Sequence, residues 1–151
     1  MAIDMKTTFP RPVGHHSITP GFVTANAPQV IAFLEGAFAG KTIRRFDAPN
    51  GQVGHAEVLI GDTVVKLGDA LAEAPMPASL SYCVATGEAV DATYQRAIAV
   101  GGKGIAEPKN QFFGYRTASV RDEGGNVWTI FAVVEPLSDE QIARRIQDGK
   151  S

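Results

Sequence analysis

The stretch "GHAEVLIGDTVVKLG", residues 54–68, places three side chains that can do chemistry in otherwise apolar sequence: His55, Glu57 and Lys66. An imidazole or a carboxylate can move a proton from a bound substrate, and an ammonium group can stabilise the negative charge that develops. Two interpretations follow. His55 and Glu57 are catalytic residues in a pocket, or the three residues are the solvated face of a β-sheet.

The same stretch predicts the hairpin that positions these residues. Gly61 and Asp62 form a two-residue turn, and counting outward from it sets Glu57 opposite Lys66, a cross-strand pair worth about 0.2–1 kcal/mol. Because side chains alternate along a strand, the hairpin has two different faces. The polar face carries His55, Glu57, Leu59, Val64 and Lys66, and the apolar face carries Ala56, Val58, Ile60, Val65 and Leu67.

The rest of the chain repeats one pattern twice, strand, helix and three strands. In the first half, strand 17–25 precedes a helix that Asn26 caps and Gly40 ends, and strands 41–48, 54–60 and 63–69 follow. In the second half, strand 79–85 precedes a helix that ends at Gly101-Gly102, and strands 102–108, 113–122 and 126–134 follow. "HAEV" at 55–58 corresponds to "TASV" at 117–120 in the second half, and "VVKL" at 64–67 corresponds to "VWTI" at 127–130, as expected of a duplicated unit.

These patterns predict an α+β fold of two βαβββ modules in tandem within a single domain, 1–151. Module one spans about 16–69 and module two about 79–135. A C-terminal helix at about 138–148 begins with the capping box "SDEQ".

Composition excludes several classes of function. Fourteen basic and sixteen acidic residues give a net charge of −2 without long runs of like charge, so we expect no nucleic-acid partner. No apolar run approaches the roughly twenty residues that span a bilayer, and the first residues contain no apolar signal core, so we expect no membrane partner. The single cysteine, Cys83, fits a reducing compartment. We expect a soluble cytoplasmic protein.

Three segments carry a resemblance to a known family: "ITPGFVTANAPQVIAFLEGAFAG", "GQVGHAEVLIGDTVVKLGD" and "QFFGYRTASVRDEGGNVWTI". Together with the two βαβββ modules, they resemble the vicinal oxygen chelate superfamily of glyoxalase I, bleomycin resistance proteins and extradiol dioxygenases. The chain is most similar to its PhnB-like branch, many of whose members have no assigned activity. The resemblance covers Ser17 to Glu135. It implies a curved mixed sheet around a pocket lined by His55, Glu57 and Lys66. It also implies a homodimer, in which Ile142 and Ile146 of the last helix could form part of the contact between subunits.

The resemblance also indicates where metal ligands would lie in this sequence. Metal-dependent members place His, Glu or Gln at four strand positions, which fall by register on Thr19, Lys66, Ser79 and Thr129. None of these is a ligand of that kind, and the ammonium of Lys66 would repel a dication. We therefore expect no metal cofactor. An atypical metal site of His16, His55 and Glu57 remains an alternative to the simpler interpretation that His15-His16 is an exposed polar entry to the first strand.

The second module supplies further candidate ligand-binding residues. By strand alternation, Tyr115, Thr117 and Thr129 face the cavity, while Trp128 packs under the helix as core. Gln111 and Phe113 approach the same strand. The predicted ligand-binding set is Lys66, Gln111, Phe113, Tyr115, Arg116 and Thr129.

Two functions stay open. The first is a metal-free protein that binds a small-molecule ligand, with Lys66 or Arg116 holding an anionic or polar group. The second is a lyase- or isomerase-type enzyme, with or without a divalent metal, in which Glu57 or His55 transfers a proton. Phosphate-binding glycine loops, a Ser-His-Asp arrangement and paired cysteines do not occur in the sequence, so they offer no competing reading.

Overall fold

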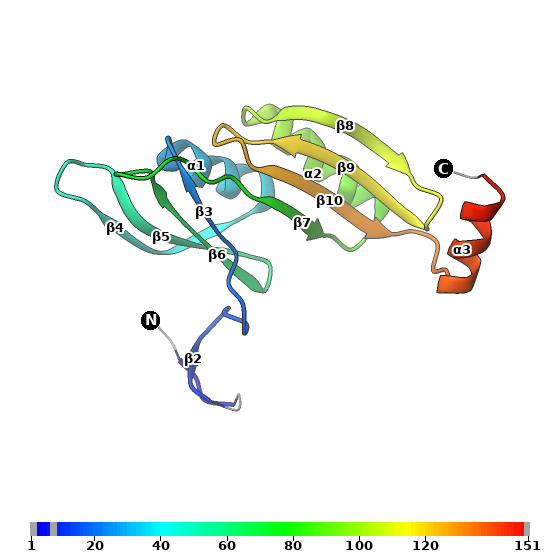
Figure 1. Cartoon of the computed structure of the whole chain (residues 1–151), viewed down its shortest axis with the longest axis horizontal. Helices are drawn as coiled ribbons and strands as arrows, with labels where there is room; N and C mark the ends of the chain where they lie inside the picture. Colours follow the sequence, from blue (N-terminus) through cyan, green and yellow to red (C-terminus); the bar gives the residue numbers. More distant parts are fainter. Residues whose placement is uncertain (1–2, 7–8, 150–151) are drawn as a thin grey trace. The chain divides into compact units, whose positions relative to one another are not determined.

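The computed structural model describes residues 3–6 and 9–149 (Figure 1). The chain forms two compact units. The first runs to Ala78 and includes the turn Glu123–Gly125, and the second comprises Ser79–Asp122 and the chain from Asn126 onward. Each unit contains a helix and a four-stranded mixed sheet in the order βαβββ, which confirms the fold class predicted from the repeat.

The first unit begins with a short antiparallel pair, β1 (Ile3–Asp4) and β2 (Arg11–Pro12), which the sequence did not predict. The module itself consists of β3 (Gly21–Thr24), α1 (Ala27–Phe38), β4 (Lys41–Asp47), β5 (Val53–Ile60) and β6 (Thr63–Asp69). Its strand order is β3-β6-β5-β4, with β3 parallel to β6 and the other pairs antiparallel.

Helix α1 forms because apolar residues recur on one side of it, and seven of its residues are buried, among them Val30, Leu34 and Phe38. The helix packs against β4, β5 and β6. The apolar face of the hairpin lies beneath it, with Ala56 and Val58 fully buried. The two faces of the hairpin are therefore sorted as predicted.

The predicted cap of α1 is wrong. Asn26 occupies the N-cap position, but its side chain makes no capping hydrogen bond; it accepts from the Thr24 hydroxyl and donates to the carbonyl of Glu123. The amide of Ala27 donates instead to the carboxylate of Asp69, at the end of β6, over 2.8 Å. A carboxylate distant in sequence thus takes the place of the local cap.

The second unit consists of β7 (Ser79–Cys83), α2 (Gly87–Ala99), β8 (Lys103–Asn110), β9 (Tyr115–Arg121), β10 (Val127–Val133) and α3 (Asp139–Gln147). Its strand order, β7-β10-β9-β8, repeats that of the first unit. Helix α2 packs on β8, β9 and β10. Trp128 is 3% exposed and its ring nitrogen donates to Asp122 over 2.9 Å, which confirms that it belongs to the core.

Strand β8 extends beyond its prediction, whereas α3 begins as predicted. Strand β8 continues past Pro108 to Asn110, with register shifts against β9; it is an edge strand, where proline is tolerated. Helix α3 starts with the predicted capping box, since Ser138 and Gln141 exchange hydrogen bonds between side chain and backbone. Within the described residues, no helix is long and apolar enough to cross a membrane.

Candidate functional site

The candidate site lies on the face of the first sheet that is turned away from α1. One row of paired residues crosses all four strands there: Gly21 on β3, Lys66 on β6, Glu57 on β5 and Arg44 on β4. The pairing of Glu57 with Lys66 is the one predicted from the turn at Gly61. Residues paired in this way point to the same face, so two cations flank one carboxylate along the row.

Glu57 is the centre of this arrangement. It is only 6% exposed, although burial of an unpaired carboxylate is costly. Arg44 places its Nε 3.4 Å from Glu57 Oε2, and two imidazoles approach the other oxygen: the Nε2 of His15 lies 3.2 Å and the Nε2 of His55 3.6 Å from Oε1. The guanidinium provides the compensating charge, and the two imidazoles place further polar groups beside the other oxygen.

Two of these partners were not predicted. Arg44 reaches Glu57 because β4 has a register shift between Thr42 and Arg44. His15 reaches it from the segment before β3, where the carbonyl of Gly14 accepts a hydrogen bond from the Val64 amide over 2.9 Å. The sequence offers no periodic signal for either contact.

The histidine pair does not behave as expected. The His15 side chain is only 13% exposed and contacts Glu57, so His15-His16 is not simply an exposed polar entry. His16 is exposed, and its Nε2 lies 3.2 Å from the carbonyl of Asp62. The atypical trio of His16, His55 and Glu57 is therefore not assembled. Across the part of the chain that the structure describes, no group of three or more His, Cys, Asp or Glu side chains is arranged to hold a metal ion.

Lys66 keeps its predicted register but not its predicted role as the partner of Glu57. Within residues 3–6 and 9–149, the ion pairs of Glu57 are with Arg44 and the two histidines, while the Lys66 side chain is exposed. The aliphatic part of the Lys66 side chain lies over Gly21, where an added Cβ would come within 3.1 Å of Lys66 Cγ. Its ammonium group is thus left to face solvent or a ligand.

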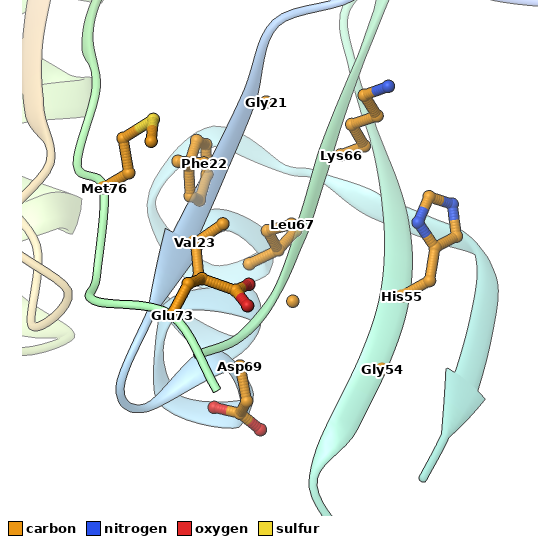
Figure 2. A pocket seen from close by; sticks show the side chains of 11 residues that line it. Gly21, Phe22, Val23, Gly54, His55, Lys66, Leu67, Asp69, Glu73 and Met76 are labelled. Atoms are coloured by element: carbon orange, nitrogen blue, oxygen red, sulfur yellow. The ribbon is translucent and has the colours of Figure 1, made fainter. Parts of the chain in front are cut away.

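A hollow of about 480 Å³, the first hollow, adjoins this row (Figure 2). His55 and Lys66 line it from β5 and β6, and Glu73 and Met76 line it from the segment that follows β6. Gly68 also lines it and has no room for a side chain, because a Cβ would lie 2.8 Å from the carbonyl oxygen of Gly54. Close approach of β5 and β6 therefore requires glycine here and keeps the space open.

The candidate residues of the second unit occupy a different environment. Tyr115 stacks on Phe131 at 5.2 Å between ring centroids, and Phe113 meets Tyr115 edge-on at 5.4 Å. Gln111 donates to the Thr117 hydroxyl over 2.9 Å. The hydroxyl oxygens of Thr129 and Ser119 lie 3.2 Å apart across β9 and β10. A second hollow, of about 600 Å³, is lined by Phe113, Tyr115, Val133, Glu135, Pro136, Leu137, Ser138, Asp139 and Ile142.

Arg116 is held by a carboxylate of helix α2. It alternates with Tyr115, so it lies on the face of β9 that carries Ala118 and packs against α2. Its guanidinium makes a two-pronged contact with Asp91, at 2.7 and 3.2 Å, and also donates to Asn110 over 3.0 Å. The hydrogen bond to Asp91 is the main cause that raises the pKa of Arg116, with burial acting against it. The role of Arg116 in ligand binding stays a prediction.

Comparison with known proteins decides the family. A sequence model of the Glyoxalase/Bleomycin resistance protein/Dioxygenase superfamily matches residues 15–130, which take in most of both modules. The chain belongs to this superfamily. An uncharacterized protein of Mycobacterium bovis is 27% identical over 135 residues, which cover 83% of this chain and 89% of that protein.

Solved structures of the glyoxalase/bleomycin resistance type share the fold. The fosfomycin resistance protein FosX of Listeria monocytogenes matches with a TM-score of 0.66 at 14% identity, over 84% of this chain and 97% of that one. A PhnB protein of Bacillus cereus matches with a TM-score of 0.62 at 15% identity, over 78% and 99%. At such low identity these likenesses show the fold of the superfamily, which hosts many functions.

Proposed function

We propose that this superfamily member is a metal-free protein that binds a small anionic molecule in the first hollow, with Lys66 as the counter-charge. The observation that carries the proposal is the division of charge along the row on the first sheet. Arg44, on the strand to one side of Glu57, pairs with its buried carboxylate. Lys66, on the strand to the other side, is exposed and lines the hollow. A ligand carboxylate or phosphonate would complete the row with a charge-assisted hydrogen bond.

The walls of the first hollow support a ligand with its charge at one end. Lys66 and His55 offer donors on the strand side, whereas Glu73 presents a carboxylate from the segment after β6 (Figure 2). Val23 and Met76 supply apolar surface beside them. Glu73 would repel a molecule with negative charge at both ends, so a monoanion with an apolar or cationic tail fits best. The name of the Listeria neighbour, a fosfomycin resistance protein, supports a small molecule as the class of ligand.

A thermal-shift screen tests this proposal. Small carboxylates and phosphonates are compared with their neutral amides and esters, using the wild-type protein and the Lys66→Ala variant. Lys41→Ala is the matched control, because Lys41 is exposed on β4 and does not line the hollow. Acids should stabilise the wild type and the control, by about 2.7 kcal/mol at a hundredfold excess over Kd, and should lose this effect in Lys66→Ala. Equal shifts in all three proteins would overturn the proposal.

The metal-free state is a separate part of the proposal and has its own measurement. It is supported by the residues Thr19, Lys66, Ser79 and Thr129 at the positions where the resemblance expects metal ligands. Elemental analysis of protein purified without chelator should give no stoichiometric transition metal. One equivalent of Zn, Ni, Mn or Fe per chain would refute it.

A second candidate function is proton-transfer catalysis of the lyase or isomerase type. The observation that favours it is the approach of two imidazoles, His15 and His55, to the same oxygen of buried Glu57. Glu57 or His55 would remove a proton from a bound acid, and Lys66 would stabilise the resulting anion. Each acid that binds is incubated in D₂O with protein, and exchange at its carbon-bound hydrogens is followed by NMR. Catalysis predicts exchange that either Glu57→Gln or His55→Gln abolishes; binding without any exchange would rule out catalysis.

We also propose a homodimer, as the family resemblance implies. Support comes from apolar side chains left exposed near the C-terminal helix: Val133 at 48%, Val134 at 41% and Ile146 at 59%. A contiguous exposed apolar patch marks a protein–protein contact site. Light scattering at micromolar concentration should give twice the chain mass, and a monomeric mass would contradict the proposal.

A further inference from the structure

We propose that the second hollow is a binding site for an organic cation, a primary or quaternary ammonium that carries an apolar group. This site is independent of the anion site proposed above, because all its residues belong to the second unit. Its lining residues come from the start of β9, the end of β10, the segment that follows β10 and the first turns of α3. Its volume of about 600 Å³ falls within the range of small-molecule pockets.

One wall of the second hollow is a fixed group of aromatic rings. Phe112 contacts Phe113 edge-on, Phe113 contacts Tyr115 edge-on, and Tyr115 stacks on Phe131, with centroid separations of 5.2–5.4 Å. Phe113 and Tyr115 line the hollow and are neither buried nor fully exposed. Ring faces carry partial negative charge and attract cations. The wall thus offers both apolar contact and a preference for positive charge.

The charged groups that line the second hollow are both carboxylates, Glu135 and Asp139. Glu135 pairs with Arg145 at 2.6 Å, and this hydrogen bond is the main cause that raises the pKa of Arg145. Within the described residues, the carboxylate of Asp139 has no ion-pair partner. One full negative charge therefore remains without compensation at the hollow.

The N-terminus of α3 opposes a cation, since a helix N-terminus carries about half a positive charge. The first turn of α3 contains two acidic residues, Asp139 and Glu140, and its amides are satisfied in part by the capping box. The full negative charge of Asp139, which lines the hollow, is larger than the half charge of the helix end, so the local field still favours a cation.

The opposite wall is held in place by contacts of α3 with the strands. Arg145 donates to the carbonyl of Phe112 over 2.8 Å while it pairs with Glu135. Gly114 turns the chain beside this contact with a φ of +91°, and any Cβ there would overlap the carbonyl oxygen of Glu135. Leu137 and Ile142 complete the apolar lining. The hollow is thus preformed rather than a gap beside a loose helix.

Titration with three probes of similar size tests this site: phenethylammonium, 2-phenylethanol and 3-phenylpropanoate. Binding is followed by methyl NMR of Leu137 and Ile142. The ammonium should bind about tenfold more tightly than the alcohol, and the propanoate should bind most weakly. Asp139→Asn should reduce the affinity for the ammonium about fivefold or more. Glu140→Gln, in the same helical turn but outside the hollow, should leave it unchanged.

Lys66→Ala keeps the outcome separate from that of the anion site, because it should not alter binding of the ammonium. Tyr115→Leu should weaken the ammonium more than the alcohol, and folding of each variant is checked by the chemical shifts of the buried Trp128. Equal affinity for ammonium and alcohol, tightest binding of propanoate, or an unchanged Kd in Asp139→Asn would each overturn the proposal.

Discussion

Replacement of Asp69 by alanine should be one of the most destabilising single substitutions in the first unit. Asp69 is 7% exposed and joins two elements that are distant in sequence. One carboxylate oxygen accepts from the amide of Ala27 at the start of α1 over 2.8 Å, and the other from the amide of Val53 at the start of β5 over 2.7 Å. Ala27 and Val53 are both 0% exposed, so neither amide can turn to water.

The size of the effect follows from these two contacts. A hydrogen bond to a charged group contributes about 1.5–3 kcal/mol, and a buried amide left without a partner costs about 1–3 kcal/mol. Loss of both contacts should therefore lower the free energy of unfolding by about 3–6 kcal/mol. Domains of this size are stable by only about 5–15 kcal/mol, so the variant should be close to unfolding at 37 °C.

Urea denaturation followed by far-UV circular dichroism measures this loss. Asp62→Ala is the matched control, because Asp62 is exposed and its carboxylate accepts a hydrogen bond from the neighbouring Thr63 hydroxyl; it should change stability by less than about 0.5 kcal/mol. Asp69→Asn keeps one acceptor oxygen and should fall between the two. If Asp69→Ala lowers the free energy of unfolding by less than about 1 kcal/mol, the carboxylate of Asp69 does not stabilise α1 and β5 through these two hydrogen bonds.

Two further substitutions test how the hollows are built. Gly68→Ala should lower the melting temperature and weaken binding in the first hollow, because its Cβ would lie 2.8 Å from the carbonyl of Gly54 and force β5 and β6 apart; an unchanged melting temperature would contradict this close approach. Arg145→Ala should raise hydrogen exchange in α3 with little change in overall stability, since Arg145 ties this exposed helix to Phe112 and Glu135. Unchanged exchange in α3 would show that other contacts hold it.

The sequence predicted the modules and the hairpin register because both depend on short-range patterns. A two-residue turn fixes which residues face each other, and a slip by one residue would turn the apolar side chains away from α1. Glu57 therefore lies opposite Lys66 as expected. The core position of Trp128 follows from the same alternation in the second unit.

The partners of Glu57 could not be predicted because each depends on a local irregularity. Simple alternation from Thr42, which pairs with Val58, would set Ile43 beside Glu57 and turn Arg44 to the face of α1. A bulge at this point sets Arg44 opposite Glu57 and leaves Ile43 37% exposed. His15 depends on the path of a segment without periodicity. The sequence of β4 does not show where this bulge occurs, so the pairing of Arg44 with Glu57 could not be predicted from it.

The assignment of Asn26 as a helix cap failed for a similar reason. Capping rules consider only the residues next to a helix end, and Asn26 fits them. The tertiary structure instead brings the carboxylate of Asp69 to the amide of Ala27, and the Asn26 side chain binds Thr24 and Glu123. The local rule identified where the helix begins but not which group satisfies its first amide.

Matched positions of the two modules separate what the duplication fixes from what it leaves free. Glu57 and Lys66 oppose each other on the first sheet, and Ser119 and Thr129 oppose each other on the second. The backbone register is the same, yet the first pair is charged and the second is a pair of hydroxyl groups 3.2 Å apart. Because both pairs are compatible with the same strands, the charge at the first pair is not needed to build the fold. We therefore assign the charges of Arg44, Glu57 and Lys66 to the proposed ligand site rather than to the fold.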